Sequence, residues 1–216
     1  MKTYKQYLNE NQDLNNLSEE EQLAAVQQDG FAIENIKNPS EQVQLEAVKQ
    51  NGHAIQFISN PSEEIQLAAV QKNGDAIKYI NNPSEKVKLA AVKEDGNAIE
   101  RIKNPSEEIQ LTAVNQNGYT IIYINNPSEQ VQLAAVKQHG DAIACINNPS
   151  EQAQLVAVKK APSEIRYIDN PSKQIQEYII LNHPNLIINN PKIANKISTE
   201  LKQKYSHILS GEDLGI

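Results

Sequence analysis

A 22-residue unit recurs along this chain and limits its fold more than any other feature. The clearest copy runs from Asn60 to Asn81 and reads NPSEEIQLAAVQKNGDAIKYIN. The same pattern begins at eight asparagines spaced 22 residues apart: Asn16, Asn38, Asn60, Asn82, Asn104, Asn126, Asn148 and Asn170. Self-similarity at a fixed period of this length is typical of solenoids, in which each repeat is one supersecondary unit that stacks on its neighbours.

Each copy predicts a longer helix followed by a short one. In the copy that begins at Asn38, that side chain suits the N-cap and Pro39 suits the first helical position. Glu41 would then return a hydrogen bond to the Asn38 amide as a capping box. Gly52 is predicted to end the helix in the left-handed conformation. The second element, built on A-I-x-x-I, is too short for more than one helical turn or a 3₁₀ helix, and the next Asn-Pro ends it.

The apolar residues of the longer helix cover most of its circumference, namely Val43, Leu45, Ala47 and Val48 in the second copy. A helix with this pattern is expected to be buried on several sides. One unit offers too little apolar surface to fold alone, so the repeats must fold as a stack. The sequence therefore predicts an all-α superhelical solenoid of about eight 22-residue helix-turn-short-helix repeats.

The two ends depart from the repeat and are predicted to cap it. We expect an N-terminal cap over residues 1–15, with Tyr4, Tyr7 and Leu8 at helical spacing, then the eight-repeat solenoid over 16–189. Residues 190–216 are predicted to form one amphipathic capping helix and a tail. In the seventh copy Ala161-Pro162-Ser163 replaces the glycine turn, so its junction is expected to differ.

Composition limits the classes of function. The formal net charge is −7 and Arg101 and Arg166 are the only arginines, which argues against a general nucleic-acid binder. The single Cys145 excludes an intramolecular disulfide and a cysteine-rich metal site. No apolar run is long enough to span a membrane, and the N-terminus lacks the apolar core of a signal peptide. We therefore expect a cytoplasmic protein without membrane association.

The repeat also resembles known families. The consensus L-A-A-V-K-Q-N-G-x-A-I-x-x-I is similar to the leucine-rich repeat variant group, which pairs an α-helix with a 3₁₀ helix. It also resembles an uncharacterised repeat domain built on A-V-K-Q-N-G-x-A-L in phage, bacterial and protist proteins. The phage association implies a viral inhibitor or adaptor that binds a host factor, in a bacterium or a phage-infected host. The cysteine cluster of one variant-repeat protein has no counterpart here, so no iron–sulfur site carries over.

The recurring polar residues favour structural roles over chemistry. We number each copy from its first asparagine as position one. The glutamates at position four form a carboxylate row that the capping role explains. The glutamines at position seven are expected to hydrogen-bond the turns between repeats. The histidines show no metal-ligand spacing, and there is no glycine-rich phosphate loop. We expect no catalytic residues, no metal and no cofactor. The lysines at positions 12 and 13 form an edge that we interpret as a solvated face.

The candidate binding surface follows from helical angles in the short helix. Positions 17, 18 and 21 set the inward direction, so position 19 should point outward and positions 16 and 20 should lie toward the edges. Position 19 is usually polar, but in the fifth copy it is Ile122, flanked by Tyr119 and Tyr123. An apolar, tyrosine-rich patch is typical of a protein interface. The predicted binding residues are Tyr119, Ile122, Tyr123, Ala144, Cys145, Arg101 at the rim, Tyr79 and Phe57.

The sequence thus favours a non-catalytic scaffold whose partner is a macromolecule, foremost a protein, with self-association into a homo-oligomer left open. Two alternatives remain at this point. One is nucleic-acid binding through the lysine edge, and the other is a helical-repeat enzyme with an unrecognised site in its groove.

Overall fold

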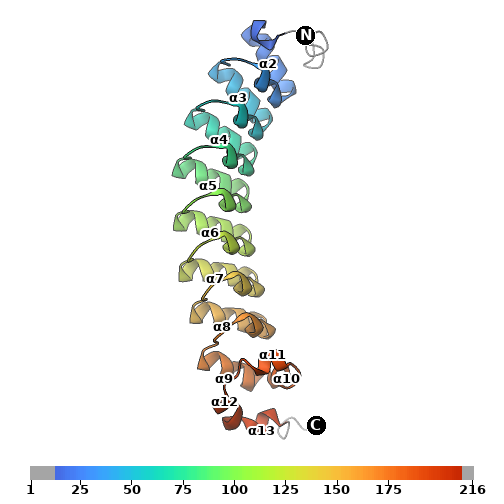
Figure 1. The fold of residues 1–216 in the computed structure, drawn as a ribbon, viewed down its shortest axis with the longest axis vertical. Coiled ribbons are helices and arrows are strands. Elements are labelled where there is room, and N and C mark those ends of the chain that lie inside the picture. Colours follow the sequence, from blue (N-terminus) through green and yellow to red (C-terminus); the bar gives the residue numbers. More distant parts are fainter. Residues whose placement is uncertain (1–12, 211–216) are drawn as a thin grey trace. The chain divides into compact units, whose positions relative to one another are not determined.

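The computed structural model describes residues 13–210, and all regular elements in that range are helical, as the sequence predicts (Figure 1). Seven pairs of an α-helix and a 3₁₀ helix follow one another, and an eighth pair of α-helices succeeds them. The chain is a helical repeat solenoid. The predicted N-terminal helix with Tyr4, Tyr7 and Leu8 and the predicted tail at 211–216 lie outside the described residues.

The longer helices of the repeats are α2 (Glu19–Gln28), α3 (Glu41–Gln50), α4 (Glu63–Lys72), α5 (Glu85–Glu94), α6 (Glu107–Gln116), α7 (Glu129–Gln138), α8 (Glu151–Lys160) and α9 (Lys173–Asn182). The 3₁₀ helices are η1 (Leu14–Asn16), η2 (Gly30–Asn35), η3 (Gly52–Phe57), η4 (Gly74–Tyr79), η5 (Gly96–Arg101), η6 (Gly118–Tyr123), η7 (Gly140–Cys145) and η8 (Pro162–Tyr167). Four short α-helices follow, α10 (Pro184–Ile188), α11 (Pro191–Ala194), α12 (Thr199–Lys204) and α13 (Ser206–Leu209).

The chain divides into two compact units between Ala113 and Val114, inside α6. In the first unit α2, α3, α4 and α5 pack in sequence, and so do η2, η3, η4 and η5. In the second unit α7 packs on α8, and η6, η7 and η8 contact one another in order. Within each unit, therefore, the longer helices form one layer and the 3₁₀ helices form another (Figure 1).

The core lies between the two layers. In the second copy α3 buries Val43, Ala47 and Val48, and η3 buries Ala54 and Ile55. The expected inward direction of positions 17, 18 and 21 is confirmed throughout the regular copies. The leucine at position eight is only half-buried in most copies, so the longer helix is buried on one broad side and not nearly all round.

The predicted helix start is wrong by two residues. Ser40, not Asn38, is the N-cap of α3, and its hydroxyl accepts a hydrogen bond from the Val43 amide at 3.3 Å. Glu41 is the first helical residue, so the expected capping box with Asn38 does not form. Asn38 instead has a φ of 50°, and five further asparagines at this position have φ between 50° and 55°. In these six copies the asparagine before the proline therefore takes the left-handed conformation, which asparagine tolerates better than most residues.

The predicted role of the glycines is also wrong. Gly52 begins η3 and is not in the left-handed region. A Cβ at Gly52 would lie 2.3 Å from the backbone oxygen of Ala69 in the next repeat. Likewise, a Cβ at Gly30 would lie 2.5 Å from the backbone oxygen of Ala47 in the next repeat. Glycine is needed here because the backbones of neighbouring repeats approach closely.

The last copies differ from expectation in two ways. Pro162 simply takes the place of the glycine, because Ala161 has φ −145° and ψ 100°, close to the values at the regular junctions, so the predicted change of junction is wrong. The single capping helix predicted after residue 190 is three short helices instead. Ser198 has an extended conformation, which breaks the helical run before α12. Its hydroxyl caps α12 by accepting a hydrogen bond from the Leu201 amide.

Candidate functional site

The side chains at positions 16, 19 and 20 of the 3₁₀ helices project from the core, and we call this set the outer 3₁₀ row. Three residues per turn place positions 16 and 19 above one another, while positions 17, 18 and 21 face inward. The row is described separately in each unit. It contains all the residues that the sequence analysis predicts as a binding site.

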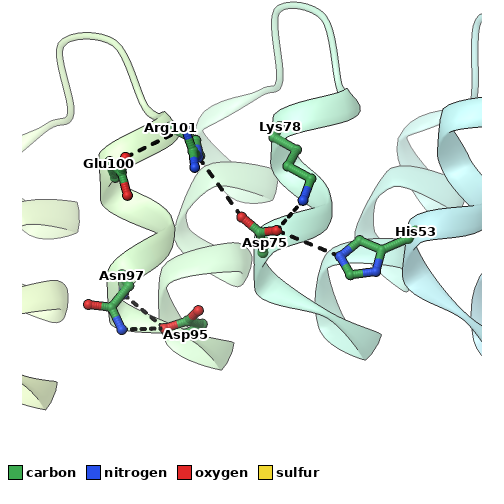
Figure 2. Close-up of polar contacts among 7 residues, drawn as sticks. All are labelled: His53, Asp75, Lys78, Asp95, Asn97, Glu100 and Arg101. Carbon is green, nitrogen blue, oxygen red and sulfur yellow. Dashed lines mark hydrogen bonds and ion pairs between the residues drawn. The ribbon is translucent and has the colours of Figure 1, made fainter.

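In the first unit, polar contacts around one carboxylate connect the row across three successive repeats (Figure 2). Asp75 of η4 is central, with Lys78 Nζ at 2.5 Å, His53 Nε2 at 3.7 Å and Arg101 Nε at 4.0 Å. The hydrogen bond to Asp75 raises the pKa of Lys78. Arg101 also lies 3.5 Å from Glu100. This part of the row is therefore charged and largely self-paired.

The aromatic residues of the first unit pack against the preceding repeat. Phe57 meets Phe31 edge-to-face at 5.8 Å between ring centroids, and Tyr79 meets His53 in the same way at 5.9 Å. Lys78 Nζ lies 4.9 Å from the centroid of the Tyr79 ring. The predicted binding residues Phe57 and Tyr79 thus already have intramolecular partners on part of their surface.

In the second unit the part of the row on η6 is exposed and consists of one isoleucine and two tyrosines. Ile122 is 61% exposed, Tyr123 43% and Tyr119 41%. Tyr119 donates a hydrogen bond from its hydroxyl to the Asp141 carboxylate at 2.9 Å and stacks on His139 with the ring centroids 4.6 Å apart. The Asp141 bond raises the pKa of Tyr119. We call Tyr119, Ile122 and Tyr123 the η6 patch.

The neighbouring helix η7 carries the remaining predicted residues of this unit. Ala144 is exposed and Cys145 is half-buried. Burial, and then the nearby Asp141 carboxylate, raise the pKa of the Cys145 thiol, which leaves it a weak nucleophile. Arg101, predicted at the rim of the η6 patch, belongs to the first unit and is paired there as described above.

The polar rows of the longer helices connect the repeats. Glu63 accepts a hydrogen bond from the Ser84 hydroxyl of the next repeat at 2.5 Å, and the corresponding bond from Ser106 lowers the pKa of Glu85. Position-seven glutamines donate to the carbonyl of their own proline, as the sequence predicts, at Gln44, Gln66, Gln110, Gln132, Gln154 and Gln176. Both rows therefore have structural partners, although the glutamate partner is not the one predicted.

Two features are absent from the residues that the structure describes. Across 13–210, no three His, Cys, Asp or Glu side chains gather in a way that could hold a metal ion. Within the same range, no helix combines the length and the apolar character needed to cross a membrane.

Comparisons with known proteins place the repeat but not a function. The family model described as a domain of unknown function (DUF4116) matches residues 40–84. The matched segment begins at the N-cap of α3 and ends at the N-cap of α5, and so covers two complete repeats. No curated protein and no solved structure matches the chain significantly.

Proposed function

We propose that the chain is a non-catalytic repeat scaffold that binds another protein through the outer 3₁₀ row, with the η6 patch as the anchor. The observation that carries the proposal is the exposure of Tyr119, Ile122 and Tyr123 side by side on one short helix. Exposed aromatic and large aliphatic side chains of this kind are the usual anchors of protein interfaces.

The surroundings of the patch support this role. The hydrogen bond to Asp141 and the stack on His139 hold the Tyr119 ring in one orientation. A side chain that is already ordered loses less conformational entropy when a partner binds. Ile122 has no polar group, so removing its exposed surface from water favours association.

The finer parts of the proposal rest on resemblance alone. Similarity of the repeat to leucine-rich repeat variants and to repeats of phage, bacterial and protist proteins suggests a phage-type inhibitor or adaptor. Such a protein would act in the cytoplasm of a bacterium or of a phage-infected host. A second copy of the chain is included among the partners that the patch could take.

The test begins with affinity capture of a partner from the native host and a measurement of its Kd for the purified chain. The variant Ile122→Glu with Tyr123→Ala should keep the melting temperature and weaken binding at least about tenfold, because a few central anchors carry most of the affinity. Leu181→Glu is the matched control, since Leu181 is exposed on α9 outside the patch.

Self-association is measured in parallel by sedimentation velocity. If the folded double variant binds the captured partner as tightly as the parent and sediments as the parent does, the patch is not the site. If Leu181→Glu weakens binding to the same degree, the loss reflects added charge and not the removal of an anchor.

A further inference from the structure

A pocket of about 490 Å³ lies in the first unit, beside the loop that joins η4 to α5 and against the end of η5. Four cationic side chains line it, Lys78, Lys88, Arg101 and Lys103. None of the described residues on its wall carries a carboxylate. Three carboxylates outside the wall approach these cations: Asp75 lies near Lys78 and Arg101, Glu100 near Arg101, and Glu85 near Lys88.

The repeat itself supplies an internal comparison. One repeat earlier, the residues at the same four positions are all neutral: Gln56, Gln66, Tyr79 and Asn81. Lys88 is the single departure from glutamine at position seven among the eight copies. Four departures from neutrality therefore coincide at one place in the fold, although they lie up to 25 residues apart in the sequence.

Lys88 also gives up a structural contact. In the preceding repeat, Gln66 donates a hydrogen bond to the Pro61 carbonyl at 3.0 Å and so fixes the turn. Lys88 instead approaches Glu85 at 3.4 Å, and the described structure has no corresponding bond to Pro83. The stack alone would favour glutamine here, so the ammonium group needs another explanation.

Three of the four cations retain donors for a ligand. The two carboxylates nearest to Arg101 are 3.5 and 4.0 Å away, beyond the usual 2.7–2.9 Å of a charge-assisted hydrogen bond. Lys103 forms no ion pair within residues 13–210, and Lys88 has the single long contact to Glu85. Lys78 is held closely by Asp75.

We propose that this pocket binds a small ligand with two or more phosphate-type oxyanion groups. Arg101 presents a planar fork of N–H donors that matches two oxygens of a phosphate, and Lys88 and Lys103 add charges beside it. The volume lies within the range of about 300–1,000 Å³ that small-ligand sites occupy. Ile80 and Ile102 also line the pocket, each with 7% of its surface exposed. The proposal is independent of the η6 patch, which lies in the other unit.

The test uses a neutral-pocket variant in which each cation takes the residue found one repeat earlier. Its substitutions are Lys78→Gln, Lys88→Gln, Arg101→Tyr and Lys103→Asn. Because each new residue already occupies the same position in a folded repeat, the variant should keep the parent's circular-dichroism spectrum. Inorganic pyrophosphate is the probe, titrated by calorimetry at low and constant ionic strength, where screening is weakest.

A matched control removes four cations elsewhere and lowers the formal net charge equally: Lys49→Gln, Lys72→Gln, Lys137→Gln and Lys159→Gln. The parent should bind pyrophosphate, the neutral-pocket variant about tenfold or more weakly, and the control within about twofold of the parent. Equal weakening in both variants, or a parent that does not bind pyrophosphate, would overturn the proposal. A single-stranded oligonucleotide bound more tightly than pyrophosphate, with the same loss in the control, would also overturn it in favour of nucleic-acid binding.

Lys88→Gln alone gives a second, independent measurement. If Lys88 serves the ligand, the Lys88→Gln variant should bind pyrophosphate more weakly. The same variant should have a higher melting temperature, because glutamine can restore the turn bond to Pro83. If Lys88 instead serves the fold, the variant should have a lower melting temperature and an unchanged affinity for pyrophosphate. That result would contradict the proposal.

Discussion

Replacing Gly52 with alanine tests how closely the repeats approach. The new Cβ would lie 2.3 Å from the Ala69 oxygen and 2.9 Å from Asn73 Oδ1, which also accepts the Gly52 amide at 2.9 Å. Overpacking of this kind costs about 1–3 kcal/mol, and weakening that hydrogen bond adds about 1 kcal/mol. The smaller conformational entropy of the unfolded chain offsets about 0.4–1 kcal/mol. We expect a net loss of about 1–3 kcal/mol, which lowers the melting temperature by about 2–4 °C per kcal/mol.

Gly140→Ala is the matched control at the same repeat position. Its Cβ would lie 3.4 Å from the Ala157 oxygen, an ordinary contact, and Gly140 is not in the left-handed region. The control should therefore be neutral or stabilising by up to about 1 kcal/mol. Urea unfolding of both variants measures the difference. Equal destabilisation of the two would refute close approach as the reason for glycine.

Three further predictions concern the turns and the C-terminal cap. Asn60→Ala should cost about 1–2 kcal/mol in urea unfolding because Asn60 has φ 54°, whereas Asn60→Gly should be nearly neutral, and equal effects would argue against left-handed strain. Ser84→Ala removes both an N-cap and the bond to Glu63 and should cost about 1 kcal/mol, while Ser84→Thr should retain most of the stability. The hydrogen bond from Lys204 lowers the pKa of Glu177 below its usual 4.5, so the stabilisation is present above that value and is lost as the pH falls through the folded-state pKa. Glu177→Gln should therefore lower the melting temperature at neutral pH and lose that effect in acid, and a pH-independent difference would contradict the ion pair.

The repeat period and the buried face could be predicted from the sequence, because both depend on the spacing of apolar residues. Ala54, Ile55 and Ile58 face inward as their positions in the short helix require, and Ile122 at position 19 is exposed for the same reason. Whether Ile122 binds a partner stays a prediction. The angles of a short helix can be read from sequence, whereas the identity of a partner cannot.

The helix ends were harder to predict because two signals compete in Asn-Pro-Ser-Glu. Asn38 and Pro39 match a cap and a first helical residue, but so do Ser40 and Glu41. The left-handed conformation of Asn38 decides between them, and it depends on how the loop crosses to the next repeat. The reason for glycine is hidden in a similar way, because the close approach between Gly52 and the Ala69 oxygen involves residues 17 positions apart and leaves no local signal.

The cationic pocket is harder to predict from the sequence. Lys88 is visible as an exception to the glutamine row, and Arg101 is one of two arginines. Their convergence with Lys103 depends on how the end of η5 lies against the preceding turn, which the repeat pattern alone does not specify.

Three of the residues that precede a junction glycine, Asn51, Asn73 and Asn117, also affect how the molecule ages chemically. Asn51-Gly52 is the dipeptide type most prone to spontaneous deamidation, which converts asparagine to a mixture of aspartate and isoaspartate. Asn51 Oδ1 accepts the His53 amide at 3.0 Å, and in the first copy Asp29 makes the same bond to Phe31. The aspartate product is therefore a residue that this junction already accommodates, whereas isoaspartate lengthens the backbone by one methylene. Stored protein should acquire negative charge and separate into acidic forms on isoelectric focusing.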